Sequence, residues 1–227
     1  MWKSVSAFMD QALEYIVPVA VPIVLCLGVI RFLLTPVFVK VEYRLPNFPD
    51  DEYGFSQQER LKYAQRARRY LVNEEGIEYL GSLTFADGSP LFNERELRHM
   101  QDVKVVLQVA FQYFWGAVLI LVIGGVWSWR RGVLESFQKG LSRGGWLTVI
   151  GLICVLFLAL VSFQSFFVVF HRLFFEGNTW VFRYSDTLIR LFPLRFWRDA
   201  FVVLALGAAG GGLLTGLFAR PRSNHPA

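Results

Sequence analysis

Two histidines supply the residue type best suited to proton transfer near neutral pH. His99 lies in RELRHMQDVKVV, shortly before a long apolar run, and His171 directly follows another such run in FVVFHRLFF. If both runs cross a membrane in opposite directions, the two histidines reach the same membrane surface. One ionisable residue at such a boundary is usually an interfacial polar residue, whereas two at one depth indicate a functional site. We therefore expect His99 and His171 to share a site with acid–base chemistry.

Charged neighbours of this site have two interpretations each. Asp102 lies three residues after His99 on the same helix face, where it either orients the imidazole or pairs as a surface charge with Arg98 or Lys104.

Two arginines and one further acid add to the candidates. Asp186 and Arg190 are spaced i, i+4, so they either form a simple ion pair or line the site. Arg31, near the end of the first apolar run, either faces protein, water or a ligand, or extends to the nearby interface. Both arginines are candidates for contacts to a substrate carbonyl or oxyanion.

An aromatic segment follows His171. Its rings, Phe174, Phe175, Trp180 and Phe182, either form an interfacial belt or wall a pocket for an acyl chain, and the two interpretations are compatible.

Other kinds of site have weak support. A metal bound by His99, Asp102, His171 and Glu176 would use a generic donor set, and the sequence lacks an HExxH motif or paired cysteines, so no metal or other cofactor is expected. Cys26 and Cys154 lie in apolar runs and are interpreted as small apolar residues. No Gly-rich phosphate loop and no Gly-x-Ser-x-Gly elbow is present.

Composition places the chain in a membrane. Of its 227 residues, 54% are hydrophobic and 16% aromatic, and the mean hydropathy is +0.41. Four apolar runs have the length of about 20 residues that a membrane-spanning helix needs. They are 15–39, 105–129, 146–170 and 200–219. The net charge of +5 is scattered, so nucleic acid is not an expected partner.

The polar segments between these runs give the topology. The short loop 130–145 and the tail 220–227 are basic, and the lead before the first span contains Lys3, a weak sign of a cytoplasmic segment. Short basic segments stay in the cytoplasm. Both termini are therefore expected inside, with residues 40–104 and 171–199 outside, although the second of these segments is itself rich in arginine. The remaining histidine, His225, lies in the tail and is interpreted as incidental.

Residues 40–104 are expected to form a structured cap. Ser56 and Glu59 make a capping box that opens a helix through about Leu71. Segments 83–85 and 90–92 are typical of short extended pieces around a turn, and Asn93 with Glu96 begins another helix that runs into the second span. We thus predict an all-α polytopic membrane protein with a small α+β extracellular cap and four transmembrane helices: the first within residues 1–39, after a short lead, and the others at 105–129, 146–170 and 200–219.

Two blocks of this sequence resemble a bacterial family of integral membrane proteins, the lipoprotein intramolecular transacylases (Lit). The first block runs from Phe92-Asn-Glu94 to His99-Met-Gln-Asp102-Val-Lys104. The second comprises Phe170-His171-Arg-Leu-Phe174-Phe175, Trp180-Val-Phe182, Asp186-Thr-Leu-Ile189 and Pro193. Four spans with a long first outer loop also fit, so the resemblance covers nearly the whole chain.

The resemblance implies an acyl shift within one molecule at the outer face of the bacterial cell membrane. The substrate would be a diacylated lipoprotein, whose sn-2 acyl chain moves to the α-amino group of its N-terminal cysteine and leaves a lyso-form. The two catalytic histidines of the family would map onto His99 and His171. A monomer in contact with membrane lipids is expected, and no cofactor.

Two other readings of the residues remain open. One is a different membrane lipid hydrolase or acyltransferase that uses a His–Asp pair or a metal. The other is a non-enzymatic membrane protein that binds lipids or lipoproteins. A transporter is less compatible with these spans, which show no inverted repeat and almost no polar path.

Overall fold

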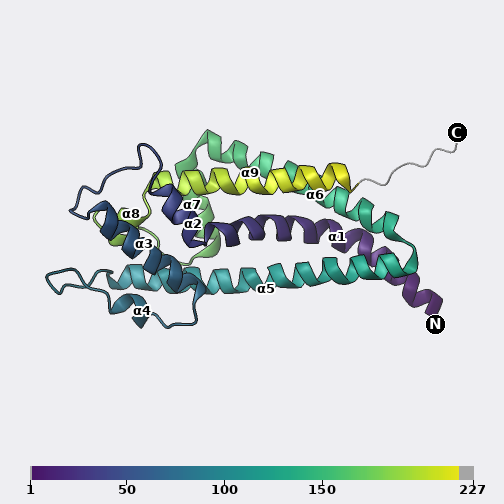
Figure 1. Cartoon of the computed structure of the whole chain (residues 1–227), viewed down its shortest axis with the longest axis horizontal. Helices are drawn as coiled ribbons and strands as arrows, with labels where there is room; N and C mark the ends of the chain where they lie inside the picture. The colour runs from purple at the N-terminus through teal and green to yellow at the C-terminus, as the bar shows by residue number, and fades with distance from the viewer. Residues whose placement is uncertain (1, 220–227) are drawn as a thin grey trace. The chain divides into compact units, whose positions relative to one another are not determined.

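The computed structural model describes the backbone of residues 2–219 and the side chains of residues 13–219. The predictions for the tail 220–227, including His225, and for the Lys3 side chain lie outside these residues. In the described part the helices are α1 (Trp2–Leu33), α2 (Pro36–Glu42), α3 (Gln57–Val72), α4 (Glu78–Gly81), α5 (Glu94–Arg131), α6 (Leu134–Val161), α7 (Phe163–Phe174), α8 (Thr187–Leu191) and α9 (Leu194–Phe218) (Figure 1). By length and composition, α1, α5, α6 and α9 can each cross a membrane. The chain is a multi-pass membrane protein.

The described residues form two compact units, and the first comprises residues 2–30, 111–158 and 203–219. Its core contains Leu13, Val17, Val21 and Phe137. Helices α6 and α9 approach closely at Gly145 of α6. A Cβ atom there would lie 2.4 Å from the carbonyl oxygen of Gly212, so only glycine permits this approach.

The second unit comprises residues 31–110 and 159–202. Its central helix is α3, which contacts α2, α4 and α8. The predicted capping box is confirmed, because Ser56 accepts from the Glu59 amide while the Glu59 carboxylate accepts from the Ser56 amide. Helix α3 buries Ala64, Ala67 and Tyr70.

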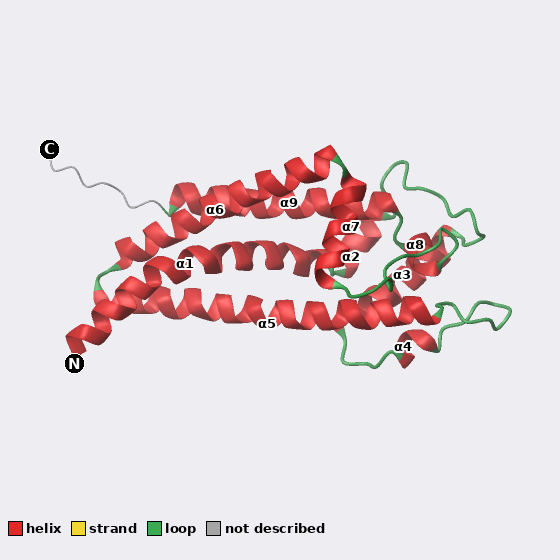
Figure 2. Ribbon diagram, turned by 180° about the vertical axis from the view of Figure 1, so that it is seen from behind, coloured by secondary structure: helices red, strands yellow, loops and turns green. Residues whose placement is uncertain are grey.

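The prediction of an α+β cap is not supported. Residues 83–91 form a turn with one isolated bridge, between Thr84 and Pro90, and no sheet occurs in the described part of the chain (Figure 2). The bridge is flanked by two backbone hydrogen bonds, from Phe85 to Ser89 and from Leu91 to Leu83. Pro90 has no N–H to donate, and the arms beside the turn are only a few residues long, so the ladder does not extend.

Two of the apolar runs are divided between helices. Run 146–170 is interrupted at Ser162, whose backbone is extended (φ −160°, ψ 101°) and whose hydroxyl accepts from the Ser165 amide at the start of α7. Run 15–39 is interrupted at Thr35, before Pro36 at the first position of α2. Conversely, α5, α6 and α9 begin before their apolar runs. The sequence predicted one continuous helix from the start at Asn93 and Glu96 into the second span, and α5 confirms it.

Contacts within the second unit hold α7 and α8. Phe163, Phe166 and Phe170 of α7 contact the ring of Phe201 in α9, at centroid distances from 4.9 to 6.3 Å. The carboxylate of buried Glu96 in α5 accepts from the Leu188 amide of α8 at 2.6 Å. These contacts fix the segments on either side of the 175–186 loop.

Candidate active site

The start of α5 places His99 inside the second unit. Asn93 and Glu96 satisfy each other reciprocally, because the Asn93 amide donates to the Glu96 carboxylate at 2.8 Å and the Glu96 amide donates to the Asn93 side chain at 3.0 Å. His99 follows three residues after Glu96, so the two side chains share one helix face. Both are buried.

His171 occupies the last turn of α7, and its tautomer follows from one hydrogen bond. Its Nδ1 lies 2.8 Å from the carbonyl oxygen of Phe167, which can only accept. Nδ1 therefore carries the hydrogen, and in the neutral ring Nε2 is left as an unprotonated acceptor. A nitrogen in this state is suited to take a proton from a substrate.

The structure brings the two histidines together. Their ring centroids lie 6.0 Å apart and the planes are inclined by 25°. Each residue is only 8% exposed. The sequence predicted that the two histidines share a site, and a separation far beyond about 10 Å would have ruled this out because one bound ester could not touch both rings.

Five aromatic rings contact the pair: Phe170 meets the His171 ring at 5.6 Å, and the other four, Phe167, Phe175, Trp180 and Phe182, we call the aromatic cage. Phe175 and Phe182 meet the His99 ring edge-on, at 4.9 and 5.3 Å. Phe167 and Trp180 lie against the His171 ring, at 4.0 and 5.1 Å, and Phe175 contacts this ring as well, at 5.6 Å.

The sequence analysis identified three members of the cage and missed Phe167. The signal for Phe167 was its position one helical turn before His171, on the same face. Phe174 was predicted to belong to the site, but it is 45% exposed and its ring packs against Phe170.

Burial sets the charge state of the pair. It lowers the pKa of His171 below the ordinary histidine value, and the hydrogen bond to Phe167 opposes this effect only in part. Two imidazolium ions this close would also repel each other. The resting pair is therefore predominantly uncharged at neutral pH.

Two buried polar atoms at the site have no hydrogen-bond partner among the described residues. They are Nδ1 of His99 and Nε1 of Trp180. Because such atoms usually find a partner in folded proteins, they mark positions where a polar ligand would be favourable.

The acidic candidates find partners that the sequence did not predict. Asp102 accepts from the Thr179 hydroxyl at 3.3 Å, and its described hydrogen bonds include none to His99. Asp186 pairs with Arg95 at 2.7 Å instead of with Arg190, and it also accepts from Asn93. Both acids thus connect the 175–186 loop to α5.

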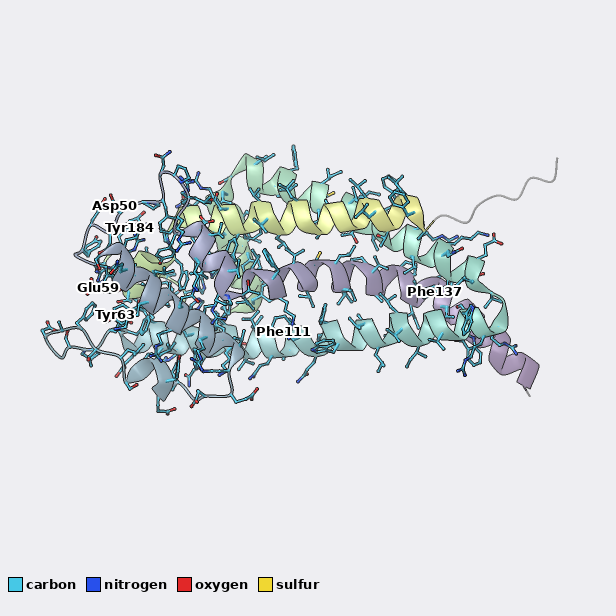
Figure 3. All side chains as sticks on the ribbon, in the orientation of Figure 1. Asp50, Glu59, Tyr63, Phe111, Phe137 and Tyr184 are labelled. Carbon is cyan, nitrogen blue, oxygen red and sulfur yellow. The ribbon has the colours of Figure 1, made fainter. Side chains whose placement is uncertain are left out.

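The described side-chain contacts of Arg190 are with Asp51 and with aromatic rings of the cap, and they include neither histidine ring. Arg190 also lines an open depression together with Asp50 and Tyr184, which Figure 3 labels at the same end of the chain's second unit. Arg31 is exposed near the end of α1.

A metal was the basis of one alternative reading. In the part of the chain that the structure describes, no group of three His, Cys, Asp or Glu side chains is arranged to hold a metal ion.

Comparisons with known proteins find similar sequences. The family model described as "Lipoprotein intramolecular transacylase Lit" matches residues 15–197. A protein of uncharacterized function from Aquifex aeolicus (strain VF5) is 32% identical over 179 residues, which cover 78% of each chain.

Two solved structures have the same fold. The lipoprotein intramolecular transacylase Lit from Bacillus cereus is 23% identical, with 92% of this chain and 93% of that chain covered and a TM-score of 0.71. A variant of that protein with one histidine replaced by alanine gives a TM-score of 0.60 at 19% identity, with 96% of each chain covered.

Proposed function

The chain belongs to the lipoprotein intramolecular transacylase (Lit) family, and from this premise we propose the reaction that it catalyses. A lipoprotein whose N-terminal cysteine carries a diacylglyceryl thioether is the substrate. Its sn-2 acyl chain moves to the α-amino group of the same cysteine and leaves a lyso-form lipoprotein. The observation that carries this proposal is the buried pair of His99 and His171, which lies within the aromatic cage and carries an unprotonated Nε2 on His171.

His171 is proposed as the general base. An α-amino group has a pKa of about 8, so much of it is protonated and not nucleophilic at neutral pH. The fraction of the substrate whose amine is already uncharged reacts: the amine nitrogen attacks the sn-2 carbonyl carbon, and Nε2 of His171 accepts the one proton that this nitrogen loses. Collapse of the tetrahedral intermediate breaks the bond from this carbon to the glycerol oxygen, and that oxygen takes the proton from the imidazolium. An amide forms, a hydroxyl is freed, and neither water nor a cofactor is consumed.

His99 is proposed to hold the reacting groups in place. Its unpartnered Nδ1 is available to the amine or to the glycerol oxygen. Because amine and ester belong to one molecule, the protein's main contribution is orientation, which accounts for a large part of the barrier in intramolecular reactions. A standing imidazolium at this position would be disfavoured by burial among aromatic rings.

The aromatic cage is proposed to bind the acyl chain and to exclude water. Phe175, Trp180 and Phe182 come from the segment that follows α7, and this segment is connected to α5 through Thr179 and Asp186. Water admitted to the site would hydrolyse the ester and release a fatty acid. In this proposal Asp102 and Asp186 position the 175–186 loop through the contacts that connect it to α5. Arg190 holds α8 to the cap through its ion pair with Asp51.

We propose the topology that the charge pattern predicts. Both termini lie in the cytoplasm, residues 40–104 and 171–199 lie outside, and the protein acts as a monomer at the outer membrane interface. Single cysteines at positions 52 and 131, in a protein without Cys26 and Cys154, test the topology by labelling of intact cells. A membrane-impermeant maleimide should label only the cysteine at position 52, and the reverse pattern would overturn the orientation.

Tandem mass spectrometry of a synthetic lipopeptide tests the function. The purified protein is incubated with a peptide whose N-terminal cysteine carries a dipalmitoylglyceryl thioether. Transfer leaves the parent mass unchanged, so an N-palmitoyl cysteine fragment reports the product. His99→Ala and His171→Ala should each abolish this fragment.

His225→Ala is the matched control, because it removes the chain's only other histidine. This variant should retain full transfer. A parent ion lighter by one acyl chain would indicate a lipase instead, and an unchanged substrate under all conditions would indicate a binding protein.

A further inference from the structure

Trp180 has an indole N–H that the fold leaves without a partner beside the histidines. Its ring centroid lies 5.1 Å from that of His171, with the planes inclined by 35°. Nε1 is buried and has no hydrogen-bond partner among the described residues. Since Nε1 is part of the ring that contacts His171, this unpaired donor belongs to the site.

The backbone around Trp180 is held on both sides. Gly177 has a positive φ of 66°, which begins the turn, and the Val181 amide donates to the Asn178 carbonyl at 3.1 Å. The Thr179 hydroxyl donates to Asp102 at 3.3 Å. The position of the indole is therefore set before a substrate binds, and preorganised donors are the effective ones in catalysis.

An indole N–H can donate but cannot accept, so only an acceptor satisfies it. A buried donor without a partner destabilises the free protein, and a ligand that accepts from it removes this cost. In the proposed transfer, the acceptor that gains negative charge is the oxygen of the acyl carbonyl. The predominantly uncharged histidine pair offers this oxygen no standing positive charge.

We infer that the Trp180 N–H donates to the acyl carbonyl oxygen and stabilises the oxyanion formed when the amine attacks. This inference rests on the proposed function and adds a catalytic residue to it. When the amine nitrogen bonds to the carbonyl carbon, the electron pair of the C=O bond moves to the oxygen that Trp180 contacts. When the bond to the glycerol oxygen breaks, the C=O bond re-forms as the amide, and the glycerol oxygen takes the proton from His171.

Unpaired buried donors also occur away from the site, so the lack of a partner is not sufficient. Nε1 of Trp127 is buried without a described partner too, but this residue packs against the core of the first unit. Trp180 differs because its ring contacts His171. Trp127 therefore supplies the matched control.

The test replaces the N–H without changing the shape of the side chain. Position 180 receives 3-benzothienylalanine, in which sulfur takes the place of the indole N–H, and a second protein carries Trp180→Phe. Single-turnover transfer is measured with the dipalmitoylglyceryl lipopeptide over a range of concentrations. Loss of one oxyanion donor lowers the rate on the order of 100-fold, so we expect the maximal rate to fall to this degree in both proteins. The lipopeptide concentration for half-maximal rate should change less than about threefold, since the donor acts mainly in the transition state.

The outcomes separate this inference from the proposed function. Trp127→Phe should transfer at the wild-type rate, which shows that loss of an unpaired indole N–H is not harmful in general. If the benzothienyl protein also transfers at the wild-type rate, the donor role of Trp180 is overturned. If the wild type hydrolyses the ester instead of transferring the chain, the proposed function fails, and the effect of the benzothienyl substitution on hydrolysis still decides the donor role.

Discussion

The guanidinium of Arg190 donates to both carboxylate oxygens of Asp51, at 3.0 and 2.9 Å, across 139 positions of the chain. The two side chains are only 8% and 1% exposed. The guanidinium also lies 3.8 Å from the ring centroid of Phe55, and the backbone carbonyl of Arg190 accepts from Arg60. This ion pair joins α8 to residues 49–60 of the cap.

Arg190→Met should destabilise the second unit strongly. It leaves the Asp51 carboxylate buried without its partner, and breaking one side of a buried pair costs about 3–5 kcal/mol. Thermal unfolding in detergent measures the loss. Glu135→Gln is the control, because its pair with Lys139 is 66% and 53% exposed and should contribute under about 1 kcal/mol. Equal midpoints for the two variants would contradict the structural role of the Arg190–Asp51 pair.

His171 should titrate below the ordinary histidine pKa of about 6.5. Burial disfavours its imidazolium, so its pKa is lowered in the folded protein. The unfolded chain therefore binds the proton more readily, and the stability that His171 contributes is present above about pH 6.5 and decreases as the pH falls through the lower folded pKa. Carbon NMR of the histidine-labelled protein measures this pKa directly, with His171→Ala to assign the signal. A midpoint at or above 6.5 would show that the ring is not desolvated as described.

Thr179→Val should loosen the 175–186 loop over the histidines. It removes the hydrogen bond to Asp102, and a loss of about 1 kcal/mol raises the open population about fivefold. Because the open loop admits water, the released fatty acid should increase relative to N-acyl cysteine in the lipopeptide assay. Thr179→Ser retains the hydroxyl and should keep the wild-type ratio. An unchanged ratio in Thr179→Val would show that this hydrogen bond does not help to exclude water from the site.

Glu42→Gln should stabilise the protein above neutral pH. Burial raises the pKa of Glu42 to about 7, and the nearby Asp199 carboxylate adds to this effect. An unfolded glutamate titrates at about 4.3, so the stabilising contribution of protonated Glu42 is complete below about pH 4.3 and is lost as the pH rises through about 7. Glutamine stays uncharged, so the unfolding midpoint at pH 8 should rise by about 2–4 °C, the shift that 1 kcal/mol gives at this chain length. The same substitution at pH 5 should have little effect, and an equal gain at both values would contradict this explanation.

Much of the architecture follows from composition and local signals. Apolar runs identify the long helices, and the capping residues Ser56 and Asn93 identify two helix starts without reference to tertiary structure. The meeting of His99 and His171 also follows, because the second span leaves one membrane surface and the third span returns the chain to it. These features depend on residue type and on position along the chain.

Other features depend on contacts that sequence spacing does not specify. Asp186 and Arg190 are spaced for a helical pair, yet each pairs with a residue far along the chain. The Ser162 break lies inside a run that remains apolar on both sides, so hydropathy does not reveal it. The cap lacks a sheet because its turn has short arms with Pro90 in one of them, which extended-strand patterns alone did not exclude.

The break at Ser162 ends α6 and starts a new helix, α7, so the direction in which His171 points does not depend on the number of residues in α6. One residue inserted into a continuous helix turns everything after it by about 100°. Because α7 begins after an extended residue and is held through Phe201, a change in the length of α6 can be absorbed at the break. An insertion between Phe163 and Phe170 would instead turn the imidazole away from His99. The helix long enough to cross the membrane is thereby separated from the helix that carries His171, the proposed general base.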